Sequence, residues 1–166
     1  NDYIAGGFLY LPDWYSCNAI IREDDSLSAV RLFFDQTPDI LDIHYFNESD
    51  IWATGGLPCH FDGDEWTLFR FSELGLGDSL SSIAMWGPNS DNMYFSGLWG
   101  CIVHYQDGEW EQIGTGITNL HLQSIHGTPD GSHVFITGYS NTNNPPLDPF
   151  GTIVLEIVGD EVNVLY

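Results

Sequence analysis

Short runs of β-branched and aromatic residues, separated by polar or glycine-containing turns, occur along the whole chain. These runs are too short for helices, and no 3.6-residue periodicity persists through them. Residues 41–46, 82–86 and 120–125 are typical, because each is followed by a second apolar run that ends at a small residue and glycine. The pattern predicts an all-β protein of short antiparallel strands.

The chain also repeats itself. One skeleton occupies residues 43–55, 83–97 and 125–138, and its leading isoleucines are 40 and then 42 positions apart. A shorter match at residues 2–6 opens the chain without the leading element. Two further stretches, 60–66 and 104–110, each carry a histidine, an aromatic residue, an Asp-Gly turn and a tryptophan.

Each repeat of about 40 residues divides into four short strands, which is typical of a β-propeller blade. We expect one domain over residues 1–166, with four blades at approximately 1–37, 38–78, 79–118 and 119–166. The first blade lacks its first strand, so we expect part of a larger ring. Two copies that close a ring of about eight blades, or one four-bladed ring with a blade short of a strand, are alternatives.

Residues 50–55 and 60–66 resemble the "DVWAVG…ILHYDGxxW" repeats of bacterial cell-surface and secreted β-propellers, and more distantly the Asp-box (BNR) repeats of sialidase-like propellers. The resemblance implies a ring of about six to eight blades. It also implies a place outside the cytoplasm, in the extracellular space, on the cell surface or in the periplasm of a bacterium. It implies no fixed chemistry. By the same resemblance, six residues are structural and hold a hairpin at the blade edge: Asp62, Gly63, Trp66, Asp107, Gly108 and Trp110.

The charge balance is strongly acidic. Twenty-four Asp and Glu face three basic residues, Arg22, Arg31 and Arg70, for a formal net charge of −21. Such a surface repels phosphate backbones, so we expect no nucleic acid as a partner. No apolar run has the length needed to cross a bilayer, so we expect no membrane insertion. The acids favour solubility, and they also suit Ca²⁺ or a basic partner, but no EF-hand loop is present. We expect no metal and no cofactor.

Three cysteines, Cys17, Cys59 and Cys101, fall at similar places in successive repeats. The count is odd and no C-x-x-C occurs, so neither a disulfide framework nor a zinc site is indicated. We expect buried, small apolar side chains.

Two histidines, His44 and His126, follow the leading isoleucine of their repeats, on the strand that lines a propeller's central channel. With Asp42 they have the chemistry to hold a divalent metal. We favour the alternative, in which each is hydrogen-bonded within its own blade, because Ala84 takes this position in the intervening repeat. His60 and His104 we expect to bond within the hairpin of the Asp-Gly turn.

Evidence for catalysis is absent from the motifs. There is no phosphate-binding loop, no nucleophile elbow and no H-E-x-x-H. The densest acidic cluster, Glu23, Asp24 and Asp25, falls in a hairpin turn, and the arginine cluster of sialidases is missing. We expect no enzyme, and a glycosidase would need acids supplied by other blades.

Two segments that join second to third strands, 9–15 and 141–150, exceed the length that a turn requires. Their aromatic and amide side chains suit recognition by stacking and hydrogen bonding. The candidate ligand-binding residues are Tyr10, Trp14, Tyr15, Trp99, Asn143, Asn144 and Asp148. The alternative is that these loops cap the blade edges and bury their own aromatic residues.

The sequence therefore favours a non-catalytic recognition or scaffolding propeller of the bacterial envelope or extracellular space, with a protein partner bound through loops. A carbohydrate-binding, lectin-like or glycan-active module is the first alternative. A structural component of an extracellular assembly is the second, with the remaining blades of the same protein or a second copy as its partner.

Overall fold

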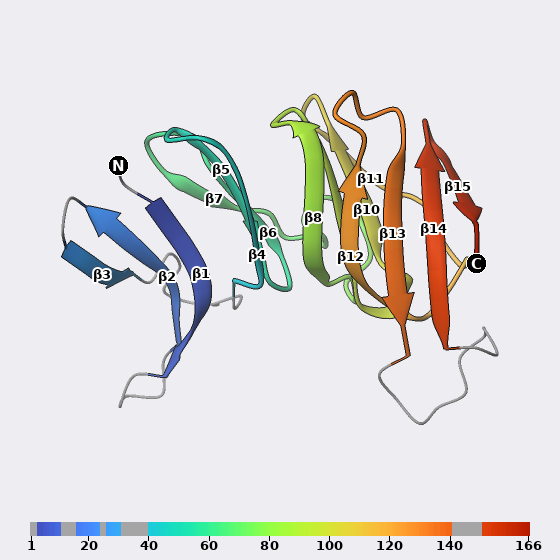
Figure 1. Cartoon of the computed structure of the whole chain (residues 1–166), viewed down its shortest axis with the longest axis horizontal. Helices are drawn as coiled ribbons and strands as arrows, with labels where there is room; N and C mark the ends of the chain where they lie inside the picture. The colour runs from blue at the N-terminus through green and yellow to red at the C-terminus, as the bar shows by residue number, and fades with distance from the viewer. Residues whose placement is uncertain (1–2, 11–15, 24–25, 31–39, 141–150) are drawn as a thin grey trace.

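The computed structural model describes residues 3–10, 16–23, 26–30, 40–140 and 151–166, and for the strands between 3 and 30 it describes the backbone. These residues form four antiparallel sheets and almost no helix (Figure 1). The expected all-β architecture of propeller blades is confirmed. We number the sheets blade 1 to blade 4 in chain order.

Strand order within every sheet follows the chain, so each blade is a four-stranded or three-stranded meander. Blade 1 contains β1 (Tyr3–Tyr10), β2 (Ser16–Glu23) and β3 (Ser26–Val30). Blade 2 contains β4 (Asp42–Asn47), β5 (Asp50–Thr54), β6 (Pro58–Phe61) and β7 (Trp66–Leu68). Blade 3 contains β8 (Ser82–Asn89), β9 (Asn92–Gly97), the 3-10 turn η1 (Leu98–Gly100), β10 (Ile102–Gln106) and β11 (Glu109–Gln112). Blade 4 contains β12 (His121–Gly127), β13 (Val134–Tyr139), β14 (Thr152–Val158) and β15 (Glu161–Val164).

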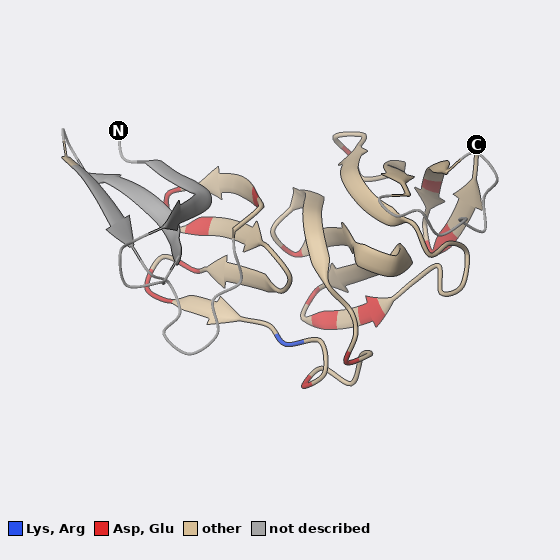
Figure 2. Ribbon diagram, turned by 90° about the horizontal axis from the view of Figure 1, so that it is seen from below, with Lys and Arg blue, Asp and Glu red and all other residues tan. Residues whose placement is uncertain are grey.

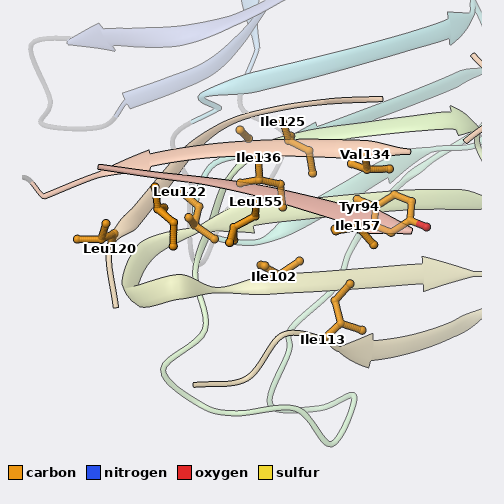
Figure 3. Packing of buried hydrophobic residues seen from close by; sticks show 12 residues of the cluster. Tyr94, Ile102, Ile113, Leu120, Leu122, Ile125, Val134, Ile136, Leu155 and Ile157 are labelled. Carbon is orange, nitrogen blue, oxygen red and sulfur yellow. The ribbon is translucent and has the colours of Figure 1, made fainter. Parts of the chain in front are cut away.

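The core lies between the sheets. Blades 2 and 3 share a cluster of buried side chains: Trp52, Phe71, Met85, Met93, Phe95, Cys101 and Val103. Blades 3 and 4 share a second cluster, in which the buried residues of β12, β13 and β14 face those of β9 and β10 (Figure 3). Each Å² of apolar surface that is removed from water stabilises the fold by roughly 25 cal/mol. The packing of apolar side chains is therefore the main stabilising interaction between blades.

Cross-strand register gives the equivalent positions of the blades. Trp52 lies opposite His60, Tyr94 opposite His104, and Phe135 opposite Glu156. Trp52, Tyr94 and Phe135 therefore occupy one position of the repeat, on the second strand of each blade.

The same register corrects the alignment of the first strands. His44 and His126 lie opposite Trp52 and Phe135, but the residue opposite Tyr94 is Trp86. Trp86, and not Ala84, therefore takes the position of the two histidines. The expectation was wrong because the pairing of β8 with β9 is irregular on both sides of this position, which shifts the sequence repeat relative to the register.

Acidic residues lie mainly at turns and strand ends (Figure 2). Among the side chains that the structure describes, Arg70 supplies the one basic group of the Lys and Arg type. Its Nε lies 3.9 Å from Glu73 Oε1 in an exposed pair, a contact of little energetic weight. Over the described residues, no helix has the length and hydropathy that a membrane span requires.

Candidate functional site

Trp99 projects from η1, between the second and third strands of blade 3. Its backbone has a left-handed φ of 58°, and 61% of its surface is exposed to solvent. A left-handed backbone conformation is energetically unfavourable for a bulky residue, so neighbouring contacts must hold Trp99 in this conformation. An indole in this state is an exposed apolar group on a constrained backbone.

Backbone contacts on both sides hold the turn. Leu98 N donates to Ser81 O at 2.9 Å, and Gly100 N donates to Leu120 O at 2.8 Å. A Cβ atom on Gly100 would lie 2.0 Å from Thr118 O, so this position admits glycine alone. The turn is thereby fastened to the starts of the first strands of blades 3 and 4.

His121, the first residue of β12, packs edge-on against Trp99. The two ring centroids are 5.1 Å apart and the planes make an angle of 84°. Opposite His121 in the sheet lies Tyr139, which ends β13 and is also exposed. The three aromatic side chains come from neighbouring blades at the end where second strands finish.

The other predicted loop residues fall outside this part of the structure. Trp14, Tyr15, Asn143, Asn144 and Asp148 lie outside the described residues, and the backbone alone is described for Tyr10. Of the acidic cluster, Asp24 and Asp25 also lie outside the described residues, and the backbone alone is described for Glu23 and for Cys17. The predicted loop site is therefore represented by Trp99, and its other members stay predictions.

A polar network joins blades 2 and 3. His60 Nε2 lies 2.8 Å from Asp50 Oδ1, and Ser90 Oγ donates to the same carboxylate oxygen at 2.6 Å. Trp52 Nε1 donates to Ser90 Oγ at 2.8 Å. The His60 ring stacks on Trp52 with a centroid distance of 4.4 Å.

This network contains a serine, a histidine and an aspartate, but its geometry is not that of a catalytic relay. Ser90 Oγ and Asp50 Oδ1 both approach the same ring nitrogen, His60 Nε2, at 3.3 and 2.8 Å. A relay needs the carboxylate on one nitrogen and the nucleophile on the other. The Ser90 hydroxyl also donates its proton to Asp50 in a hydrogen bond, so Ser90 is a structural bridge between blades 2 and 3.

The same pair of positions is polar in blades 3 and 4. His104 Nε2 lies 2.9 Å from Asn92 Oδ1, and the His104 ring stacks on Tyr94 at 4.0 Å. Burial lowers the pKa of His104, against the opposing attraction of Asp160 and Glu111. His60 and His104 therefore bond to the start of the second strand, and not within the hairpin of the Asp-Gly turn as we expected.

Blade 4 reverses the chemistry of this pair. His133 Nδ1 lies 2.9 Å from Glu156 Oε1, so the histidine stands directly before the second strand, β13, and its acceptor lies on the third, β14. Neither residue was among the sites predicted from the sequence. The signal was present, because Glu156 falls in the column of His60 and His104 once third strands are aligned.

The candidate channel residues, His44 and His126, lie on the first strands β4 and β12. The His44 pKa is lowered, first by burial and also by the positive charge of His126, while Asp42 opposes the shift. Asp42 accepts hydrogen bonds from the backbone N–H groups of Ile43 (3.0 Å) and Met85 (2.9 Å). Within the described ranges, no three His, Cys, Asp or Glu side chains gather so that they could hold a metal ion.

The Asp-Gly turns contact the preceding turn of their own blade. Asp62 Oδ1 accepts from the N–H groups of Asp64 (2.9 Å) and Glu65 (3.0 Å), and these bonds lower the Asp62 pKa. Gly63, at φ 99°, lies against Ser49.

In blade 3, Asp107 and Gly108 both have positive φ, at 51° and 92°, and Asp107 N donates to Asp91 O at 2.9 Å. These two residues form the tight turn between β10 and β11. The turn thereby fastens the outer hairpin to the turn that precedes β9.

The repeat tryptophans pack on different faces of the structure. Trp110 lies within ring-contact distance of five aromatic residues between blades 2 and 3: Trp52, Phe69, Phe71, Phe95 and Tyr105. Trp66 packs on Phe61 at 5.5 Å and joins a cluster around Ile40, Ala53 and Cys59. Both tryptophans are packing residues in these contacts.

The side chains of two of the three cysteines, Cys59 and Cys101, are described, and both are buried free thiols. Burial raises the pKa of Cys59 to about 12 and that of Cys101 to about 11. The thiolate, which is the reactive form, is therefore scarce at neutral pH.

Comparison with known proteins places the chain by fold. No protein-family model matches it, and no curated protein is recognisably similar in sequence. The solved structures that are similar in fold include two that are propeller-like. The first is described as YCF48 bound to D1 peptide, with 14% identity, a TM-score of 0.57, and coverage of 96% of this chain and 48% of that chain.

The second is PorZ, described as an essential bacterial surface component of the type-IX secretion system of Porphyromonas gingivalis. It has 14% identity and a TM-score of 0.54, with coverage of 90% of this chain and 23% of that chain. The chain thus spans about half of the first protein and about a quarter of the second. At this identity the likeness shows the fold.

Proposed function

We propose that this chain is part of a non-catalytic β-propeller that recognises a protein partner at the Trp99 surface. The observation that carries the proposal is the exposed indole of Trp99 on a left-handed backbone that is fastened on both sides. Exposed tryptophans on constrained backbone are typical anchors of protein interfaces, because little entropy is lost when they are buried.

The charge of the chain indicates the chemistry of the partner. A net charge of −21 favours encounter with a basic segment, and tryptophan binds Lys and Arg cations through its ring face. The fold neighbour bound to a peptide supports a peptide segment as the ligand. The neighbour from a bacterial surface supports a place in the bacterial envelope or extracellular space.

A glycan is the alternative ligand, because an exposed indole also stacks on sugars. Glycan hydrolysis would require a pair of acids across a cleft, supplied by other blades, in addition to this surface. Binding measurements on a peptide array and on a glycan array distinguish the two ligand classes.

The experiment applies the purified chain to an array of peptides and to an array of glycans at about 0.15 M salt, where long-range attraction between exposed charges is largely screened. We expect binding to Lys- and Arg-containing peptides and none to their acidic counterparts. Trp99→Ala should weaken that binding by roughly thirtyfold, the loss of about 2 kcal/mol typical of an anchor residue. Circular dichroism checks that the variant is folded.

Leu41→Ala is the matched control, since Leu41 is another exposed apolar side chain that precedes β4 in blade 2. It should bind peptides as the parent chain does. Equal peptide binding by the Trp99→Ala variant would refute the site. Binding to glycans alone, lost in the Trp99→Ala variant, would replace the protein partner with a carbohydrate.

A further inference from the structure

The segment that leads into the first strand of blade 4 supports the backbone of the turn that carries Trp99. Gly100 N donates to Leu120 O at 2.8 Å, and a Cβ atom on Gly100 would lie 2.0 Å from Thr118 O. Leu120 and Thr118 are both buried, and Leu120 N donates to Thr118 Oγ1 at 3.1 Å. Blade 4 therefore gives η1 a well-packed support.

The same segment continues into β12, whose first residue is His121. The residues on either side of it, Leu120 and Leu122, are buried in the core between blades 3 and 4. Across the sheet, His121 is paired with Tyr139 of β13. His121 is itself half-buried, so its position is set by strand pairing and by the packing of its neighbours.

The side chain of Trp99 has few contacts of its own. It is 61% exposed, and among the described residues no group accepts a hydrogen bond from its indole N–H. Within the same part of the chain, His121 supplies the one aromatic ring in contact with it. The backbone bonds of η1 fix the main chain of Trp99 but not its two side-chain torsions. The contact with His121 is therefore the one that restricts rotation of the indole.

The geometry of this contact is favourable. The ring centroids of Trp99 and His121 are 5.1 Å apart and the ring planes make an angle of 84°. Edge-to-face pairs with centroids about 4.5–7 Å apart are one of the arrangements that aromatic rings prefer. Blade 4 thus contacts both parts of Trp99, its backbone through Leu120 and its side chain through His121.

We propose that His121 is a positioning residue of the Trp99 surface, which holds the indole in the orientation that recognises the partner. The inference rests on the proposed function, because it assigns His121 a role in that same recognition. An interfacial side chain that is free to rotate loses this freedom on binding, and the loss weakens affinity. By restricting Trp99 beforehand, His121 strengthens binding without itself contacting the partner.

The first measurement uses the chain without any ligand. The order parameter of the Trp99 indole N–H, from 15N NMR relaxation, reports its motion on the picosecond-to-nanosecond timescale. The resonance is assigned by its disappearance in the Trp99→Ala variant. We expect a value of about 0.85 in the parent chain and below about 0.6 in the His121→Ala variant. His121→Phe, which keeps an aromatic ring at this position, should restore the parent value.

The second measurement is the dissociation constant of an oligo-arginine peptide at about 0.15 M salt. His121→Ala should raise this constant about fivefold, as expected when one interfacial side chain is freed, and His121→Phe should reverse most of the increase. His126→Ala is the matched control, because it removes an exposed histidine of the same strand and should change neither measurement. Circular dichroism checks the fold, and His121→Gln is the second variant if His121→Ala does not fold.

The outcomes separate this inference from the proposed function. An indole that stays rigid in the His121→Ala variant would overturn the inference alone, because the η1 backbone would then be sufficient to fix Trp99. A mobile indole with unchanged peptide binding would overturn it as well. If Trp99→Ala binds the peptide as the parent chain does, the proposed function fails, and the inference fails with it.

Discussion

In blade 4, His133 and Glu156 form the same polar contact that Asp50 and His60 form in blade 2, with the histidine and the carboxylate exchanged between the two strands. His133 Nδ1 lies 2.9 Å from Glu156 Oε1, and His60 Nε2 lies 2.8 Å from Asp50 Oδ1. In both blades the contact joins the start of the second strand to the third strand. A slip of one residue would separate the two groups, so the pair favours the native register.

The first prediction is that this pair can be exchanged. Glu156→Ala should lower the free energy of unfolding by about 1 kcal/mol, because it removes a partly buried hydrogen-bonded pair. The double variant His133→Asp with Glu156→His restores the arrangement of blade 2 and should recover most of that loss. Urea unfolding of the parent, the single variants His133→Asp and Glu156→His, and the double variant measures the coupling.

Glu161→Ala is the control for the removal of one acidic side chain, since Glu161 is exposed on β15. It should change the unfolding midpoint little. If the double variant lost as much free energy of unfolding as the two single variants lose together, the contact would not stabilise blade 4.

The second prediction concerns the bridge between blades 2 and 3. Ser90→Ala removes the acceptor of the Trp52 indole N–H and one donor to Asp50. Since Trp52 is almost completely buried, its N–H is left without a partner, and the loss should be roughly 1–3 kcal/mol. Ser49→Ala, which removes an exposed hydroxyl bonded to Asn47, should cost less than about 0.5 kcal/mol. Equal losses in the two variants would contradict the bridge.

Much of the fold was predictable because its determinants are local. Alternating apolar runs, a repeated Asp-Gly turn and tight glycines each specify a short strand or a turn from a few neighbouring residues. The three-stranded sheet of blade 1 was predictable for the same reason, since residues 2–6 match the second strand of the later repeats. The order of strands within each sheet follows directly from such local hairpins.

The contacts between blades were not predictable in this way. Ser90 meets Asp50 and Trp52 across 40 and 38 positions of sequence, and no motif marks that contact. The position of Trp86 depends on irregular pairing, which a count of residues between isoleucines does not reveal. The left-handed turn at Trp99 depends on partners in two other segments, Ser81 and Leu120.

The third prediction compares two turn glycines that have similar backbone but different surroundings. Gly63 and Gly108 have φ of 99° and 92°. A Cβ on Gly63 would lie 2.6 Å from Ser49 Cβ, whereas a Cβ on Gly108 would meet nothing within 4 Å. Gly108→Ala should cost about 1 kcal/mol for its left-handed backbone, and Gly63→Ala about 3 kcal/mol because the turn must also move.

Thermal and urea unfolding of both variants give the comparison directly. The two alanine variants control for each other, because the added atom is the same. If Gly108→Ala were the more damaging change, the contact of the blade 2 turn with Ser49 would not be a stabilising feature of that blade.

The fourth prediction concerns pH and rests on His104. Burial lowers its pKa from the ordinary value of 6.5, so the unfolded chain binds this proton more readily than the folded one. Stability from this group is therefore complete above about pH 6.5 and falls as the pH decreases through the folded-state pKa. His44, whose pKa is also lowered chiefly by burial, contributes in the same direction.

Asn92→Asp tests the assignment, because it places a carboxylate where an amide oxygen now lies 2.9 Å from His104 Nε2. The new charge should raise the His104 pKa, as an opposite charge within hydrogen-bond distance does, and so reduce the loss of stability on acidification. The measurements are an NMR titration of the His104 ring and urea midpoints at about pH 7.5 and about pH 5.5, on either side of the ordinary value. Asn119→Asp adds the same charge at an exposed position and should keep the parent's pH dependence. An Asn92→Asp variant with the parent's difference between the two midpoints would exclude His104 as the source of that dependence.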